Sequence, residues 1–292
     1  MSKLKIAKTV STLTQPPIIT VPIFLIISVL LSFSEGVFDF NEFIALEAVS
    51  LVFASILPIA IILLWAKWID TDHDISNRQD RFVPLIIGII SYFIGVLVCL
   101  YLNLNHFLTL LLLCYSVNTG VVLLITLRWK ISVHTTGISG PIAALILLLG
   151  PVGALFGVIY PIVIWSRVLL KKHTLAQAIC GGVQGFFLTV LEMYLFMHIL
   201  NLPVYGMVGL LESCMYIMAI IATPVVLGIL SYIKVNNSGA IFAVCEIILA
   251  AIFLILTPWN VFLIFLILTL TCIMVSFYAG PDFVWFRVLK SS

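Results

Sequence analysis

The chain alternates between long apolar runs and short polar segments. Most of the runs extend over roughly 18–25 residues without the alternation typical of barrel strands, and a helix of that length crosses the hydrocarbon core of a bilayer. The fifth run is short, and we expect it to form a hairpin with the sixth around Gly150-Pro151; one kinked element in their place would change the count. The pattern predicts about ten membrane-spanning helices, over about 17–34, 46–66, 83–103, 106–127, 138–149, 151–169, 174–200, 208–232, 239–257 and 259–279.

Composition supports this interpretation. Hydrophobic residues make up 63% of the 292 residues, charged residues make up 9%, and the mean hydropathy is +1.28. A soluble domain carries about 25% charged residues, so this chain has too few to cover a surface that faces water. Because only helices and closed barrels satisfy their backbone hydrogen bonds in lipid, the sequence predicts an all-α, polytopic transmembrane helix bundle.

The distribution of charge predicts the orientation of the bundle. With ten spans, both termini lie on the same face, and the loops of the opposite face carry Glu35, Asp39 and Glu42 but no basic residue. The positive-inside rule makes the basic face cytoplasmic, so we expect an integral protein of the cell membrane with both termini in the cytoplasm. That face collects all 14 basic residues, namely Lys3, Lys5, Lys8, Lys67, Arg78, Arg81, Arg128, Lys130, Arg167, Lys171, Lys172, Lys234, Arg287 and Lys290.

Three polar segments, 67–82, 128–137 and 166–173, meet at the basic face, and each contains one histidine. Arg binds phosphate oxygens in bidentate geometry and Lys adds a point charge, so such a cluster suits a lipid that carries a phosphate. The alternative interpretation is that these are solvated charges, which hold the topology and attract anionic lipids.

Two motifs in these segments resemble signatures of a known family. The pattern Ser-Arg-x5-His over 166–173 is similar to the third signature of the type-2 phosphatidic acid phosphatase superfamily, which includes the vanadium haloperoxidases, and residues 131–137 resemble a diverged second signature. The first signature is loose, within the Asp- and Arg-rich stretch 74–81. The resemblance covers about residues 67–186 and implies a phosphatase-like core of spans 3–7 (67–200). The N-terminal spans 1 and 2 (1–66) and the C-terminal spans 8–10 with a basic tail (201–292) lie outside it.

The resemblance also implies a mechanism. The substrate that it implies is a lipid or isoprenoid phosphate or diphosphate, hydrolysed without a metal or a cofactor. It implies no role for nucleic acid. In this scheme one histidine attacks phosphorus and forms a phosphohistidine, while a second protonates the leaving alkoxide. The implied roles are nucleophile for His173, general acid for His134, phosphate binding for Arg167, Arg81 or Arg78 and Ser132, and orientation of the imidazole for Gln177.

The chain departs from the family pattern at three positions. Gln177 stands where the family has Asp, Val133 replaces a glycine, and Asp74 occupies the place of a lysine. An amide can orient an imidazole but does not stabilise the imidazolium as a carboxylate does. These departures favour an alternative function, a lipid-phosphate-binding membrane protein with weak catalysis or none.

Two other functions remain open. Asp70, Asp72, Asp74 and Asp80 resemble the aspartate-rich loop of intramembrane prenyltransferases, in which carboxylates bind Mg²⁺ bridged to a diphosphate, although the chain has no second pair of aspartates. A transport role would draw on carboxylates inside the apolar runs, which are costly and often functional, but no motif accompanies them. They are Glu192, Glu212 and Glu246.

Overall fold

The computed structural model describes residues 2–34, 36–70, 75 and 77–200, and in this part the protein is almost entirely helical. Five of its helices are long and apolar enough to cross a membrane, or six if one bent pair counts as a single span. The spans expected over 208–232, 239–257 and 259–279 lie outside the described residues, as does the basic tail. The protein is therefore an all-α membrane protein in the part that the structure describes.

The helices follow the apolar runs closely. The described elements are α1 (Lys3–Leu13), α2 (Pro16–Leu31), β1 (Phe33–Ser34), β2 (Val37–Phe38), α3 (Phe40–Ser50), a π-helical turn (Leu51–Ile56), α4 (Leu57–Trp68), a 3₁₀ turn (Gln79–Arg81), α5 (Phe82–Tyr101), α6 (His106–Thr126), α7 (Val133–Leu149), a 3₁₀ segment (Gly150–Val158), α8 (Ile159–Leu169) and α9 (Leu175–Ile199).

The basic N-terminus forms a helix that the apolar pattern does not predict. Ser2 caps α1 by accepting a hydrogen bond from the Lys5 backbone N–H. Pro16 and Pro17 cannot continue α1, because proline has no N–H and its ring clashes with the preceding turn, but they fit the first turn of α2. The chain bends by 60° between the two helices. As a result α1 leaves the line of α2 and packs against α8.

The second span is longer than predicted and is not a regular α-helix throughout. It runs from Phe40 to Trp68 and contains the π-helical turn. Asp39 caps its start by accepting hydrogen bonds from the backbone N–H groups of Asn41 and Glu42. A π-helical turn leaves a carbonyl free for other donors, and the Ser91 hydroxyl of α5 donates to the Phe53 carbonyl at 2.7 Å.

The segments around Gly150 form a helical hairpin, in agreement with the pattern. Gly150 ends α7 with a φ of +62°, which favours glycine. Gly153 then lies so close to the Leu145 backbone that a Cβ would overlap it. The 3₁₀ segment and α8 therefore turn back along α7 as separate packed elements.

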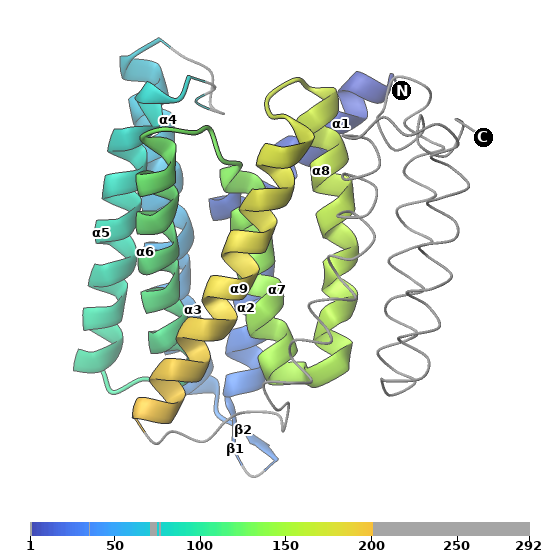
Figure 1. The fold of residues 1–292 in the computed structure, drawn as a ribbon. Helices are drawn as coiled ribbons and strands as arrows, with labels where there is room; N and C mark the ends of the chain where they lie inside the picture. The colour runs from blue at the N-terminus through green and yellow to red at the C-terminus, as the bar shows by residue number, and fades with distance from the viewer. Residues whose placement is uncertain (1, 35, 71–74, 76, 201–292) are drawn as a thin grey trace, which may run out of the picture.

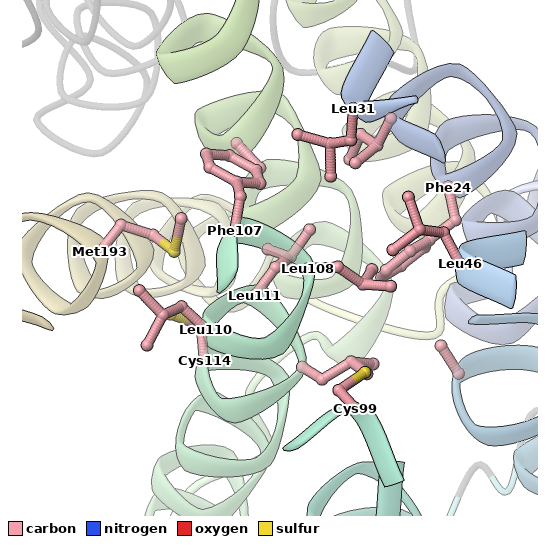
Figure 2. Close-up of a cluster of buried hydrophobic side chains, with 14 of the residues drawn as sticks. Phe24, Leu31, Leu46, Cys99, Phe107, Leu108, Leu110, Leu111, Cys114 and Met193 are labelled. Atoms are coloured by element: carbon pink, nitrogen blue, oxygen red, sulfur yellow. The ribbon is translucent and has the colours of Figure 1, made fainter. Parts of the chain in front are cut away.

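One apolar cluster fills the half of the bundle that lies away from the basic residues. It joins the second halves of α2 and α5, the first half of α6, the end of α7, and parts of α3 and α9. Figure 2 shows Phe24 and Leu46 on one side of Leu108 and Leu111, with Met193 on the other. The opposite end of the bundle carries the N-terminus and the loops between α4 and α5, α6 and α7, and α8 and α9 (Figure 1). The N-terminus and these three loops, with their basic residues, define what we call the basic end of the bundle.

Glycines bring α7 and α9 into direct contact. A Cβ on Gly181 would lie 2.5 Å from the Ser132 carbonyl oxygen, and one on Gly185 would lie 2.6 Å from the Thr136 carbonyl oxygen. Small residues four apart let two membrane helices approach closely, and the Thr136 hydroxyl uses this proximity to donate to the Gly181 carbonyl at 2.9 Å. The contact fixes the first turn of α7 beside the first turns of α9.

We expect Gly185→Ala to destabilise the protein by about 1–3 kcal/mol, because the added methyl group overlaps backbone of α7. The matched control is Gly120→Ala, since a Cβ at Gly120 meets no atom within 4 Å and alanine is the better helix former. Thermal unfolding in detergent micelles measures the effect. A melting temperature for Gly185→Ala at or above that of Gly120→Ala would contradict the close packing of α7 and α9.

Candidate functional site

His173 lies in the turn between α8 and α9 at the basic end. Lys171 adopts a φ of +55° in this turn, and the backbone N–H groups of Lys172 and His173 both donate to the Arg167 carbonyl, at 3.1 and 3.4 Å. The tight turn folds His173 back toward the last turn of α8, where only 6% of its surface is exposed. Neither ring nitrogen of His173 has a hydrogen-bond partner in the described part of the chain, although both are buried.

Arg167 is completely buried at the end of α8, and α1 supplies its surroundings. Its Nη1 donates a short hydrogen bond to the Ser11 hydroxyl. The adjacent Ser166 hydroxyl donates to the Ala7 carbonyl at 2.8 Å. The two bonds fasten the inner face of α1, Ala7 and Ser11, to the end of α8. The N-terminal helix is therefore one wall of the site.

Arg81 approaches from the other side of the cluster and is 5% exposed. Its Nε donates to the Ile75 carbonyl at 2.8 Å and its Nη1 donates to the Ile131 carbonyl at 3.3 Å. Arg78 points elsewhere: its Nη1 donates to the Leu127 carbonyl at 2.7 Å, and it does not contribute to the field at His173. Of the two arginines expected as alternatives, the structure brings Arg81 to the site.

His134 occupies the first turn of α7 and is buried, with 6% exposure. Ser132 caps this helix, since its hydroxyl accepts from the Thr135 backbone N–H at 3.4 Å, and its own N–H donates to the Gln177 carbonyl at 3.3 Å. His134 interacts electrostatically with both Arg167 and Arg81. The hydroxyl of Ser132 thus serves the helix start that carries His134.

The charges of the cluster act strongly on His173. Burial, which is the largest cause, and the positive charges of Arg81, Arg167 and Lys130, with the nearby His134, together lower the pKa of His173 to about 2. The imidazole is therefore neutral at physiological pH. Buried cations that oppose another positive charge create a positive potential, which favours the binding of an anion.

Gln177 does not make the contact with His173 that the resemblance implies. Its side-chain oxygen accepts from the Thr174 backbone N–H at 3.1 Å, while the Thr174 hydroxyl accepts from the Gln177 N–H at 3.2 Å. This reciprocal pair is a capping box, which satisfies free N–H groups at a helix start. In this structure Gln177 caps α9 and makes no hydrogen bond to the His173 ring.

Sequence patterns identify several of these residues but not all of them. His173, His134, Arg167 and Arg81 come together, from three polar segments that are distant in the chain. Ser11 was not predicted; the only signal was that Ala7 and Ser11 are small residues four apart on a basic segment. Lys130 was not singled out either.

The aspartates of the proposed Mg²⁺ loop are only partly described. Asp72 and Asp74 lie outside the described residues, together with His73. Asp70 is exposed, and the backbone carbonyl of Asp80 accepts from the Trp65 indole N–H at 2.8 Å. Within the described ranges, no group of three His, Cys, Asp or Glu residues could hold a metal ion.

A cavity of about 140 Å³ adjoins the basic cluster. Arg81 and His134 line it where they face the cluster, and it continues between α2, α4, α5, α6 and α7 past Gly88 and Tyr92. Its wall is mainly apolar. A ligand held by Arg81 therefore has access to a partly open, mainly apolar space between these helices.

A buried hydrogen-bond network lies beside the inner end of this cavity. Asn118 of α6 donates to the Thr189 hydroxyl and to a Glu192 carboxylate oxygen of α9, each at 3.2 Å, and accepts from Gln184 at 2.9 Å. Glu192 is 6% exposed, so the carboxylate that the sequence placed inside an apolar run is buried in the bundle. The network joins α6 to α9, as interhelical hydrogen bonds do in membranes.

No family model, no curated protein and no solved structure matches this chain.

We expect protein stability to fall on acidification because of His173. The folded-state pKa of His173 lies far below its ordinary value of 6.5, so the unfolded state binds more protons as the pH falls below 6.5, and each proton bound favours unfolding. Neutral His173 therefore costs no folding free energy above pH 6.5, and the free energy of unfolding falls progressively as the pH drops below that value. His173→Gln should therefore flatten the decline in melting temperature between pH 7 and pH 4, whereas His106→Gln, at an exposed histidine, should leave it unchanged.

We also expect Ser11→Ala to destabilise the protein by about 1–3 kcal/mol, because a buried hydrogen bond to a charged group is removed. Thr12→Ala is the matched control, since Thr12 is the exposed neighbour on the same helix. Thermal unfolding of both variants beside the wild type measures the difference. Equal melting temperatures for the two variants would show that Ser11 does not hold Arg167.

Proposed function

We propose that this chain is a membrane phosphohydrolase, which cleaves a lipid or isoprenoid phosphate or diphosphate through a phosphohistidine on His173. One observation carries the proposal: a neutral, buried imidazole without a hydrogen-bond partner stands beside two buried arginines. A neutral imidazole has the lone pair that attack on phosphorus requires. The arginines supply the donors that neutralise the charge of a phosphoryl group.

The proposal extends to the architecture of the whole chain. Residues 67–200 would be a phosphatase-like helical core, with N-terminal spans before it and three further spans after it, ten in total. The basic end would face the cytoplasm by the positive-inside rule, with both termini on that side. Support comes from the helix ends at 67–68, 78–81, 128–130 and 167–172, whose basic residues all lie at that end of the bundle (Figure 1).

The proposed reaction has two steps. A ring nitrogen of His173 attacks phosphorus, the N–P bond forms, and the bond from phosphorus to the ester oxygen breaks while His134 gives that oxygen a proton. Water then attacks phosphorus, the N–P bond breaks, and inorganic phosphate leaves as His134 recovers a proton. Arg167 and Arg81 hold the phosphate oxygens through both steps, because charge develops on those oxygens in the transition state.

A second candidate function is supported by Gln177. Its amide caps α9, and no described side chain forms a hydrogen bond to the His173 ring. In a serine protease triad, the loss of the group that orients the catalytic imidazole lowers turnover by about ten-thousandfold. A site of this kind binds the phosphate group of a lipid through its arginines but hydrolyses the ester slowly. This favours a lipid-phosphate-binding protein with weak catalysis as the alternative.

Phosphate release from prenyl and glycerolipid phosphates in detergent, with excess EDTA, tests the proposal. We expect release by the wild type and a loss of about a thousandfold or more in His173→Ala, since a covalent nucleophile cannot be replaced by its neighbours. His106→Ala is the matched control, because His106 is exposed at the far end of the bundle.

Binding of orthovanadate, a phosphate analogue, separates the alternatives. Vanadate binding that Arg167→Ala abolishes, without phosphate release, would support the binding protein and contradict the enzyme. Neither binding nor release would contradict both functions. Release that EDTA abolishes would favour a Mg²⁺-dependent enzyme and contradict the metal-independent mechanism.

A further inference from the structure

The cavity extends along α5. Arg81 precedes α5 and Tyr92 lies eleven residues further along the chain, and both line the cavity; at 1.5 Å per residue they are separated by about 16 Å along the helix axis. The volume is only about 140 Å³. A protein cavity of this size takes up a molecule as small as benzene. Length combined with a small volume describes a space for one chain.

A glycine keeps this space open. Gly88 lines the cavity, and a Cβ there would meet no atom closer than the Tyr92 ring at 3.8 Å. The helix could therefore carry a larger residue at this position without overlap of its backbone. A side chain at position 88 would instead project into the cavity. Glycine at position 88 therefore leaves this part of the cavity unfilled.

The polar side chains that line the inner end of the cavity already form hydrogen bonds to other protein groups. Asn118 and Thr189 line it, but Asn118 donates to Thr189 and Glu192 and accepts from Gln184, while the Thr189 hydroxyl donates to the Gly185 carbonyl at 2.7 Å. Both residues are thus engaged with protein groups. The cations lie at the other end, where Arg81 and His134 adjoin the basic cluster.

We propose that the cavity holds the first part of a single hydrocarbon chain, whose phosphate binds to the basic cluster. This inference rests on the proposed function and specifies its substrate: a phosphate ester with one chain attached directly to the ester oxygen. A diacylglycerol phosphate branches into two chains within the glycerol unit, beside the phosphate, and we expect a volume of about 140 Å³ to admit one of these branches but not both. The substrate therefore enters chain first, and its phosphate remains at Arg81.

Discrimination between single-chain and branched substrates in such a site depends on the shape of the substrate. A chain that moves from lipid into an apolar cavity exchanges one hydrocarbon environment for another, so burial itself provides little affinity. The cavity discriminates because a chain that fits lets its phosphate reach Arg81 and Arg167, and a branched one holds its phosphate away. We therefore expect the preference to appear in kcat/KM, which compares how substrates reach the transition state.

The test compares dodecyl phosphate with dioleoyl phosphatidate on the full-length protein in detergent. We expect kcat/KM for dodecyl phosphate to exceed that for phosphatidate by at least about tenfold, and Gly88→Leu to lower the dodecyl phosphate value by at least about tenfold, because the leucine occupies the space of the chain. Inhibition by orthovanadate, which has no chain, should remain unchanged in Gly88→Leu. Gly120→Leu is the matched control, since that glycine borders open space and does not line the cavity.

The outcomes separate this inference from the function on which it rests. Equal kcat/KM for the two wild-type substrates, or wild-type activity in a vanadate-sensitive Gly88→Leu, would overturn the single chain and leave the phosphatase in place. No release from either substrate would overturn the phosphatase. The comparison of substrates on the wild type decides the matter even if Gly88→Leu fails to fold, and Gly88→Ala then provides a smaller reduction of the same space.

Discussion

The basic end of this protein depends on the burial of the Arg167 guanidinium in a bundle made for lipid. A charge without water is expensive unless neighbouring groups replace its hydration. The Ser11 hydroxyl accepts a hydrogen bond from this guanidinium, and the turn at 171–173 donates to the Arg167 backbone carbonyl. α1 bends away from α2 to reach it, and the chain after α8 turns back over it. The position of His173 follows from that turn.

The two halves of the bundle are held together by different means. The half away from the basic end is packed with apolar side chains from six helices, some of which Figure 2 shows. Toward the basic end, glycines and hydroxyl groups replace them: Gly181 and Gly185 admit α7, and Thr136 bonds to the Gly181 carbonyl. Close backbone contact is rigid, since it leaves no side chain that can repack. A rigid frame therefore carries the histidines, and the cavity opens beside it.

Sequence patterns were sufficient where burial in lipid decides the structure. The predicted helices over 83–103, 106–127 and 174–200 are confirmed as α5, α6 and α9 within a few residues, because hydropathy reports directly on length in a membrane. The same signal missed α1, whose lysines lower its hydropathy although its Ala7–Ser11 face is buried. It also missed the role of Gln177, because an N-cap depends on where a helix begins, and that boundary is the least certain feature of a sequence. Ser11 could not be assigned, because its partner lies 156 residues away.

That separation has a consequence for biogenesis. α1 is synthesised well before α8, but the groups that Ala7 and Ser11 bind are at positions 166 and 167. Until α8 has been made, the inner face of α1 has no partner, and the lysines on its other face keep it at the membrane surface. The cluster around Arg167 can therefore be assembled only after α8 has been made, and the docking of α1 onto the end of α8 is a step that completes it.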